Sequence, residues 1–287
     1  MDKMNEMNLQ SSQLISNVQI NSNKKSFYCE FKNKNFKIFI QKGDLLDQQV
    51  NTIVNAANNS LILGGGVAGA ILSKCGYKIQ EECNGIILKR GDLEVSESVH
   101  TSNNGKINAN FIIHAVGPRW TDYKDKIECY DDLKATFYNI LMYAENKLPS
   151  ANSIAIPLIS SGIFGVPRSL CCKALFFGLE EYLTDSDDSR RKLEIVRLVN
   201  IDDETNDELV KFFREKFLKI DCHLELEVKN DEKREIIKTE MIKDLLSCRM
   251  CEIELEKNEA TKFDCGCYYC VDCRENIEQG NQCKCQN

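Results

Sequence analysis

The sequence lacks three features that would assign it to broad classes of protein. No stretch approaches the ~18 consecutive apolar residues of a membrane-spanning helix. The first 25 residues contain no apolar core of about 7–15 residues, so we expect no secretory signal. The 37 Lys and Arg do not outnumber the 44 Asp and Glu, whereas a nucleic-acid-binding protein normally has a basic surplus. We therefore expect a cytoplasmic and/or nuclear chain with no membrane partner, and nucleic acid is disfavoured.

Cysteine, by contrast, is abundant, with fifteen in 287 residues, and its distribution is uneven. Seven cysteines are scattered through the first 222 residues, whereas eight fall between Cys248 and Cys285. Without an export signal, they are interpreted as reduced thiols, metal ligands or buried apolar residues rather than disulfides. The length fits about two domains at ~150 residues each, and the step in cysteine density places their boundary between about 220 and 247.

Two flanking segments differ from the rest of the chain. Residues 1–26 are rich in Asn, Ser and Gln with little periodicity, which predicts a disordered tail. Segment 221–247 is charged and nearly free of Gly and Pro. Its apolar residues recur at roughly helical spacing, at Ile236, Ile237, Met241, Ile242, Leu245 and Leu246. We therefore predict a helical connector over 221–247.

Residues 27–220 alternate short apolar runs with amphipathic segments. We predict buried strands at 36–40, 52–57, 111–117, 154–159 and 194–200, and helices at 67–82, 130–146, 168–183 and 206–218. Strands that alternate with helices imply an α/β fold with a largely parallel sheet covered on both faces. In such sheets ligands bind beyond the carboxyl ends of the strands.

Two glycine-rich loops follow predicted strands at that edge. Asn58 to Gly66 carries three successive glycines and leads into a helix, and Ser160 to Gly165 follows a later strand. Bare backbone N–H groups at a helix N-terminus suit a phosphate or diphosphate, although a glycine-rich turn can equally be structural. Neither loop fits the GxGxxG or GxxxxGK[ST] motif. Spacing alone suggests a nucleoside diphosphate derivative without naming it.

Several motifs together resemble the macrodomain family. They are Gly43-Asp44-Leu45, Val54 through Asn58, Gly64 through Ile71, and Ile156-Pro157 with Ser160 through Gly165. A further run, Ile113 through Trp120, is similar to the macrodomains of animal antiviral ADP-ribosyltransferases. The match covers about residues 30–220. The resemblance implies a three-layer α/β/α macrodomain over 27–220, with a mixed, largely parallel sheet. Members bind ADP-ribose, free or attached to protein, and some hydrolyse its ester with a protein carboxylate.

The resemblance also implies a role for each matched residue. Asp44 would accept a hydrogen bond from the adenine amino group with Leu45 beside it, and Asn58 would contact the distal ribose. The implied ligand-binding residues are Asp44, Leu45, Asn58, Gly65, Gly66, Val67, Ser161, Gly162, Ile163, Phe164, Gly165 and Asn200. Structural alternatives stay open, namely a turn at Asp44 and at Asn58, and core packing for Phe164.

Two departures from the family bear on hydrolysis. Typical hydrolases read Gly-Val-Asp-Gly in the first loop, where this chain has Ala68 instead of the water-positioning aspartate. Coronavirus macrodomains share the Gly-Gly-Gly-Val-Ala-Gly run but usually carry histidine before it, where this chain has Leu63. Acid–base help would have to come from the ligand's phosphate or from water, so we expect slow hydrolysis at most, with Asn58 as its catalytic residue. His114, inside an apolar strand, is interpreted as a core histidine.

The eight C-terminal cysteines have the spacing of metal ligands. They are Cys248, Cys251, Cys265, Cys267, Cys270, Cys273, Cys283 and Cys285. Four thiolates make one tetrahedral zinc site, so this series predicts two zinc ions. A segment under ~40 residues is too small for a sufficient core, so the metal would supply much of its folding free energy. We predict a zinc-stabilised domain over 248–287.

The order of these ligands resembles a RING finger. A cross-braced arrangement would place Cys248, Cys251, Cys270 and Cys273 on one zinc and the other four cysteines on the second. RING fingers usually recruit a ubiquitin-conjugating enzyme through an apolar residue before the second ligand, where Met250 stands, although an apolar filler would look the same. Cys267 replaces the usual histidine, the last pair lacks its proline, and Gln286 stands where active members often have a basic residue.

Three functions compete for this pair of modules. The chain could bind ADP-ribosylated protein and ubiquitinate it or recruit partners, hydrolyse Glu/Asp-linked ADP-ribose, or serve as a zinc-dependent scaffold. Retention of Asp44 and Asn58 argues against the scaffold, and the absence of the family's aspartate and histidine argues against efficient hydrolysis. Residues 221–287 carry 10 Lys and Arg against 16 Asp and Glu, a balance of −6 that favours a protein partner. We expect the first function, with hydrolysis as the alternative.

Overall fold

The computed structural model describes residues 15–20, 26–31, 36–185 and 191–227, together with four two-residue strands near the C-terminus. The chain divides into two compact units, Met1–Asp221 and Cys222–Asn287, and each is described by itself. Within the described ranges, no helix has the length and apolar character needed to cross a membrane.

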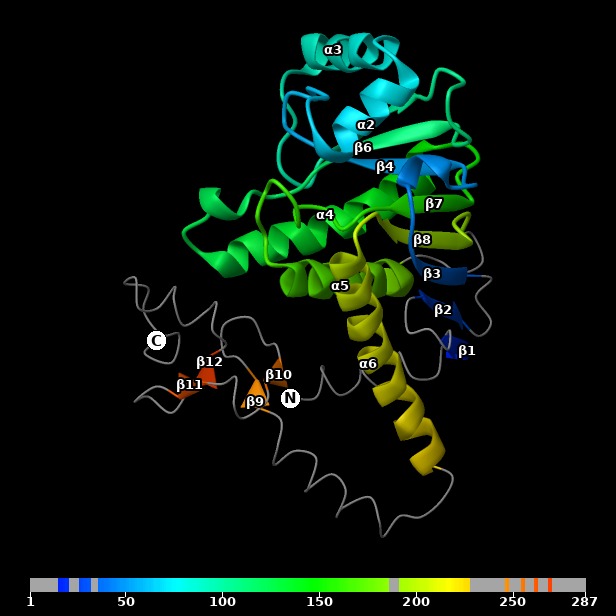
Figure 1. Cartoon of the computed structure of the whole chain (residues 1–287), viewed down its shortest axis with the longest axis vertical. Helices are drawn as coiled ribbons and strands as arrows, with labels where there is room; N and C mark the ends of the chain where they lie inside the picture. The colour runs from blue at the N-terminus through cyan, green and yellow to red at the C-terminus, as the bar shows by residue number, and fades with distance from the viewer. Residues whose placement is uncertain are drawn as a thin grey trace. The chain divides into compact units, whose positions relative to one another are not determined.

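The first unit is built on one eight-stranded mixed sheet (Figure 1). Its strands are β1 (Ile15–Ile20), β2 (Ser26–Phe31), β3 (Phe36–Lys42), β4 (Thr52–Ala57), β5 (Ser98–Ser102), β6 (Phe111–Val116), β7 (Ser153–Ile156) and β8 (Ile195–Asn200). The order across the sheet is β1-β2-β3-β8-β7-β4-β6-β5. The five central strands run parallel, whereas β1 and β2 at one edge and β5 at the other pair antiparallel.

Helices cover one face of this sheet through an apolar cluster. The described helices, on both faces of the sheet, are α2 (Gly66–Cys75), α3 (Lys78–Arg90), α4 (Lys126–Lys147), α5 (Arg168–Asp185) and α6 (Asp203–Glu227), with short 3-10 turns η1 (Leu45–Asp47) and η2 (Trp120–Asp122). On the face considered first, α2 and α3 supply the contacts. Ile71 of α2 and Ile79 of α3, both fully buried, pack in one cluster with Ile53 of β4 and Ile112 of β6. The α2–α3 layer therefore covers this face.

The opposite face is covered by α4, α5 and α6. Phe36 of β3 contacts Tyr182 of α5, with ring centroids 6.2 Å apart, and Phe27 of β2 contacts Phe213 of α6 at 6.1 Å. Helices α4 and α5 lie side by side (Figure 1), and Gly178 of α5 faces the backbone of α4. The architecture is the predicted three-layer α/β/α arrangement with a mixed sheet.

The apolar runs in the sequence identify the central strands correctly. Strands β3, β4, β6, β7 and β8 all form where an apolar run predicts them. Parallel strands covered on both faces are apolar at nearly every position, and all four residues of β7 are buried. Buried on both faces, these strands hold their carboxyl ends together at one edge of the sheet.

The predicted disordered tail is wrong where β1 forms and at Ser26, which begins β2. Strand β1 pairs antiparallel with β2, so that Ile15, Val18 and Ile20 stand opposite Phe31, Cys29 and Phe27. The register shifts between Ile15 and Asn17, and this irregularity breaks the period-2 alternation that identifies a strand in the sequence.

Two further elements differ from the prediction over 67–105. The single helix predicted at 67–82 is divided into α2 and α3 by Gly76, whose φ of +81° is a left-handed conformation that ends the first helix. Strand β5 is not predicted at all. It is an edge strand with one fully covered residue, Thr101, and its SVHTS sequence has no apolar run.

The second unit is described only in short strands. Strand β9 (Leu246–Ser247) pairs antiparallel with β10 (Glu254–Leu255), and β11 (Thr261–Lys262) pairs antiparallel with β12 (Tyr268–Tyr269). Of the predicted connector, 221–227 belong to α6, 246–247 are extended rather than helical, and 228–245 lie outside the described residues. The eight predicted zinc ligands and Met250 also lie outside them.

Candidate ligand-binding site

A pocket of about 670 Å³ opens at the carboxyl ends of the five parallel strands. Each strand contributes the residues that follow it, as the parallel arrangement requires. Asp44 follows β3, Asn200 ends β8, Ser161 follows β7, Asn58 follows β4 and Arg119 follows β6. One side-chain set from five separate segments therefore surrounds a single cavity.

The first glycine-rich loop delivers the N-terminus of α2 to this pocket. Gly65 precedes the helix, and no side chain caps its first-turn N–H groups. Gly66 has a φ of +56°, and a Cβ atom there would meet nothing within 4 Å, so the backbone is open to a ligand. Uncapped N–H groups and the helix dipole together favour an anion at this point.

The segment before these glycines is held by two amide side chains. Asn58 accepts from the backbone N–H of Ile62 at 3.0 Å and donates to its carbonyl at 2.9 Å. Gln80 of α3 accepts from the N–H of Leu63 at 2.8 Å and donates to the carbonyl of Leu61 at 3.1 Å. Leu61 is fully buried with a φ of +53°. These two amide side chains fix the backbone conformation of the segment that immediately precedes the three glycines.

The second loop follows β7 and is shaped by Ser160, whose φ is +65°. Its carbonyl accepts from the N–H of Val166 at 3.0 Å, and Ser161 donates its hydroxyl to the carbonyl of Leu158 at 2.6 Å. Gly117 lies so close that an added Cβ would stand 2.4 Å from Ser160 Oγ. A left-handed serine in a loop is uncommon and is the kind of strained residue that clusters at binding sites.

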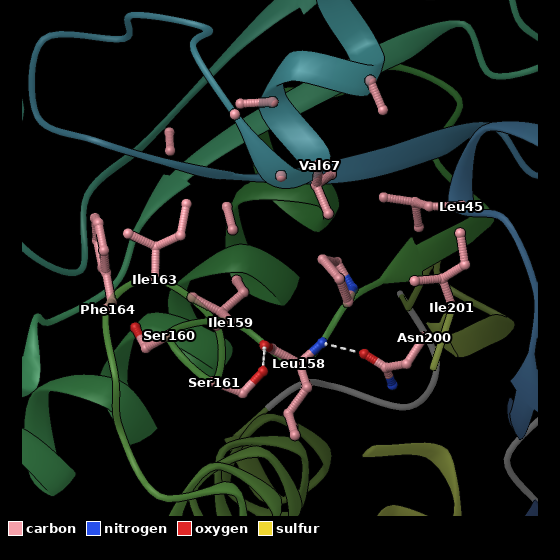
Figure 2. Close-up of a pocket in the computed structure, with 18 of the residues that line it drawn as sticks. Leu45, Val67, Leu158, Ile159, Ser160, Ser161, Ile163, Phe164, Asn200 and Ile201 are labelled. Carbon is pink, nitrogen blue, oxygen red and sulfur yellow. Dashed lines mark hydrogen bonds between the residues drawn. The ribbon is translucent and has the colours of Figure 1, made fainter. Parts of the chain in front are cut away.

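One end of the pocket contains two hydrogen-bonded polar residues. Asp44 Oδ1 caps η1 by accepting from the N–H of Leu46 at 2.8 Å. Asn200 Oδ1 accepts from the N–H of Leu158 at 3.0 Å (Figure 2), whereas its Nδ2 is buried and makes no hydrogen bond within the described structure. A buried amide donor without a partner is costly, so Asn200 is well placed to donate to a ligand.

The other end of the pocket contains Phe164 and Arg119. Figure 2 shows Phe164 and Ile163 across the pocket from Leu45 and Asn200. The Arg119 guanidinium lies over the Phe164 ring, with Cζ 4.6 Å from the centroid. The loops that carry them are joined by the backbone, since the N–H of Trp120 donates to the carbonyl of Phe164 at 2.8 Å.

The structure brings eleven of the twelve predicted ligand-binding residues into this pocket. They are Asp44, Leu45, Asn58, Gly65, Gly66, Val67, Ser161, Gly162, Ile163, Phe164 and Asn200. Gly165 is the exception. It has a φ of +71°, and its N–H donates to the carbonyl of Gly162 at 2.9 Å, so it closes the loop rather than lining the cavity. Contacts of the eleven residues with a ligand stay a prediction.

Two pocket residues after β6 and one after β8 are not predicted from the sequence. Gly117 and Arg119 line the pocket, as does Asp202, whose carboxylate accepts from the N–H of Thr205 at 2.8 Å at the start of α6. Burial alone would raise the pKa of Asp202, but hydrogen bonds from Thr205, together with smaller effects of the Asp202 backbone N–H and of Arg168, outweigh burial and lower that pKa. Position at the end of a parallel strand was the available signal for all three.

The acid–base groups of a hydrolase are sparse in this pocket. Its ionisable lining residues are Asp44, Asp202 and Arg119, while positions 63 and 68 are a buried Leu and a buried Ala. His114 is confirmed as a core histidine. It is fully buried, its Nδ1 is 3.0 Å from Asn55 Nδ2 and its Nε2 is 2.9 Å from Thr101 Oγ1. Desolvation, with a smaller effect of His100, lowers its pKa to about 4.

Comparisons with known proteins agree with this architecture. The macro domain family model matches residues 54–175. A macro domain-containing protein of Listeria monocytogenes is 36% identical over 168 residues, which cover 58% of this chain and 92% of that protein. A longer uncharacterized protein of Thermotoga maritima is 41% identical over 190 residues, or 66% of this chain, and the chain spans only 29% of its length.

Solved structures extend the likeness to the fold. The Oceanobacillus iheyensis macrodomain with ADP has a TM-score of 0.60 and 26% identity, over 68% of this chain and 98% of that one. A mutant of the same macrodomain, solved with ADPR, has a TM-score of 0.58. A three-layer fold with a pocket at the carboxyl ends of its parallel strands defines the class as an α/β protein with a cavity at the end of its sheet. The chain belongs to the macro domain family.

Proposed function

We propose that this protein binds ADP-ribose and ADP-ribosylated protein through the pocket of its first unit. The observation that carries the proposal is the pair of loops after β4 and β7, which face one cavity from an uncapped helix N-terminus and a strained serine turn. Such a cavity suits a diphosphate between two nucleoside-like ends. The ADP and ADPR in the Oceanobacillus iheyensis structures support the same ligand class for this chain.

Calorimetric titration of the full chain with ADP-ribose tests this function directly. We expect saturable binding of one ADP-ribose per chain, and weaker binding of adenosine because it lacks the diphosphate. Adenosine is the matched ligand control, since it retains the base and one ribose. No heat of binding for ADP-ribose at millimolar concentration, in protein shown to be folded by circular dichroism, would refute the proposal.

We further propose that the second unit is a RING-like zinc module that transfers ubiquitin to the bound protein or recruits a partner. The eight cysteines support the proposal, because thiolates are preferred ligands of structural Zn²⁺ and tetrahedral sites use four of them. Two zinc ions held by these cysteines would supply folding free energy. Met250 is the proposed contact with a ubiquitin-conjugating enzyme.

Hydrolysis of Glu/Asp-linked ADP-ribose is the alternative function and needs its own assay. A protein mono-ADP-ribosylated on glutamate is incubated with the chain, and bound and released label are followed with Asn58→Ala as the comparison. Retained label is expected, because the amide of Asn58 is engaged by Ile62 and no carboxylate or imidazole occupies positions 63 or 68. Release that disappears in Asn58→Ala would establish the hydrolase instead.

A further inference from the structure

The charged side chains of the pocket are divided between its two ends. Asp44 follows β3 and Asp202 follows β8, and these strands are neighbours in the sheet. Arg119 follows β6, on the far side of β7 and β4, and is the cation among the described residues that line the pocket. In the proposed ligand orientation, Asp44 contacts the adenine and Asn58 contacts the distal ribose. Arg119 then stands at the distal-ribose end, where the modified protein would be attached.

The Arg119 guanidinium is held in place but keeps its hydrogen-bonding capacity. It lies 4.6 Å from the Phe164 centroid, and no hydrogen bond joins it to any other residue in the described structure. Its ion pair with Asp122 is long, at 3.9 Å, and both side chains are largely exposed. Exposed pairs of this kind contribute little. A guanidinium stacked on a ring presents its donors edge-on to an oxyanion at a small cost in side-chain entropy.

Most other polar side chains at this end are already engaged; the Ser160 hydroxyl is the exception, buried and without a hydrogen bond in the described structure. The amide of Asn58 binds both backbone groups of Ile62 and also accepts from Ser60 at 3.2 Å. The hydroxyl of Ser161 is donated to Leu158. Next to Phe164, Ile163 is 78% exposed and can offer only apolar contact. Arg119 is thus the side chain at this end with charge and several donors available to the group attached to the distal ribose.

We propose that Arg119, stacked on Phe164, recognises a carboxylate in the protein segment that carries ADP-ribose, next to the modified residue. The inference rests on the proposed function and assigns its substrate class, a mono-ADP-ribosylated acidic segment. A guanidinium and a carboxylate match in geometry and can form two parallel hydrogen bonds. The exposed Ile163 beside the pair would cover the aliphatic part of the acidic side chain.

The charge of the protein favours such a segment over a polymer of ADP-ribose. The chain has a formal net charge of −7, and the ionisable residues that line the pocket sum to −1, from one Arg and two Asp. Each additional ADP-ribose unit adds two negative charges, and a polyanion is normally bound by a surface with a basic surplus. A single cation, Arg119, at this end of the pocket is suited to a single carboxylate.

A double-mutant cycle tests the contact between Arg119 and the carboxylate. Two peptides carry one mono-ADP-ribosylated residue followed by either glutamate or glutamine, and dissociation constants are measured for the wild type and Arg119→Gln. We expect the wild type to prefer the glutamate peptide by roughly 3–10-fold, and Arg119→Gln to reduce that ratio to about one. Arg168→Gln is the matched control, because Arg168 is similarly exposed, lies outside the pocket and should leave the ratio unchanged.

The outcomes of this experiment separate the role of Arg119 from the proposed binding of ADP-ribose. Equal affinity of the wild type for the two peptides, or a ratio that survives in Arg119→Gln, would overturn the role of Arg119 while leaving ADP-ribose binding intact. A larger Arg119-dependent gain for a two-unit ADP-ribose oligomer than for the glutamate peptide would also overturn it in favour of the polymer. Failure of the wild type to bind free ADP-ribose would instead refute the proposed function itself.

Discussion

Asp44 illustrates how one side chain can serve the fold and the ligand together. Its Oδ1 atom caps η1 through the N–H of Leu46, which realises the turn-forming alternative drawn from the sequence. Its Oδ2 atom makes no hydrogen bond within the described structure. A carboxylate has acceptor sites on both oxygens, so capping leaves Oδ2 for the adenine amino group. The two interpretations of Asp44 are therefore compatible.

Asp44→Asn separates these two roles. Asparagine caps helices as well as aspartate does, so the bond from Leu46 should survive. The amide NH₂ would then face the adenine amino group, donor against donor, and we expect the dissociation constant for ADP-ribose to rise by about 10–100-fold. Titration calorimetry measures the change, with Asp47→Asn as the control on the same turn. Similar affinities for the two variants would contradict the assignment of Asp44.

His114 makes stability depend on pH. Its folded pKa is about 4 against an ordinary value of 6.5, because burial disfavours the charged ring. The unfolded chain takes up a proton below pH 6.5 that the folded chain refuses until about pH 4. His114 therefore contributes stability that is complete above pH 6.5 and is lost as the pH falls. At pH 5 the loss is on the order of 2 kcal/mol.

Urea denaturation at pH 7 and pH 5 tests this expectation. The wild type should lose more stability between the two pH values than His114→Gln does. His100, whose pKa is lowered mainly by its own desolvation, is the histidine to compare. His100→Gln should retain most of the wild-type pH dependence, because His100 is only partly buried. An unchanged pH dependence in His114→Gln would show that the imidazole charges without unfolding the protein.

At the scale of the element, α4 and α5 pack so closely at Gly178 that no room remains for a larger side chain there. A Cβ atom on Gly178 of α5 would stand 2.8 Å from the carbonyl oxygen of Lys134 and 3.0 Å from Cβ of Phe137, both on α4. Separations this short require the helix backbones to move apart. Gly85, inside α3, would meet nothing within 4 Å. The two helical glycines therefore have opposite expected responses to the same change.

Gly178→Ala should lower the free energy of unfolding by about 1–3 kcal/mol, because it overpacks the interface between α4 and α5. Gly85→Ala should raise it by roughly 0.5–1 kcal/mol, because alanine restricts the unfolded chain and suits a helix. Chemical denaturation of both variants measures the difference. Stabilisation by both changes would mean that α4 and α5 can separate at little cost.

The elements that sequence patterns predict are those with the most uniform surroundings. The run at 52–57 identifies β4 because neighbouring layers cover both of its faces. Strands β1, β2 and β5 are not predicted, since β1 contains a register shift, β2 lies next to it near one edge of the sheet and β5 lies at the other edge. The break at Gly76 is also missed, because apolar periodicity continues from α2 into α3 while the backbone turns.

The site divides in the same way between what local sequence shows and what the sheet assembles. Glycine runs and the Asp44 motif are contiguous, so they can be recognised before the fold is known. Arg119 also lies in a contiguous run, Ile113 through Trp120, but that run does not reveal its role, which comes from β6 ending beside β4 and from a contact with Phe164. Arg119 and Phe164 are 45 positions apart in the sequence, and only the fold brings them together.

At the scale of the whole molecule, the two units should respond independently to metal removal. We expect metal analysis of the fresh protein to find about two zinc ions per chain. Replacement of both Cys248 and Cys251 by serine should lower the count to about one, whereas Cys222→Ser should leave it unchanged. Elemental analysis by mass spectrometry gives the number. A count near zero in the freshly purified wild type would refute the zinc module.

Removal of zinc by a chelator should leave ADP-ribose binding largely unchanged. The first unit has a hydrophobic core of its own, and among its described residues no group of His, Cys, Asp or Glu is arranged to hold a metal. Titration with ADP-ribose before and after chelation measures the effect. A loss of binding that returns with added Zn²⁺ would show that the units are energetically coupled.

Six buried thiols provide a way to time the opening of this fold. They lie on β2, α2, α3, α4 and α5, at Cys29, Cys75, Cys83, Cys129, Cys171 and Cys172. Burial raises the pKa of Cys83 to about 11 and that of Cys129 to about 12, so neither reacts readily in place. Each is alkylated only when its own element exposes it. The order in which a mild alkylating reagent labels these positions would therefore rank the layers by how often each one opens.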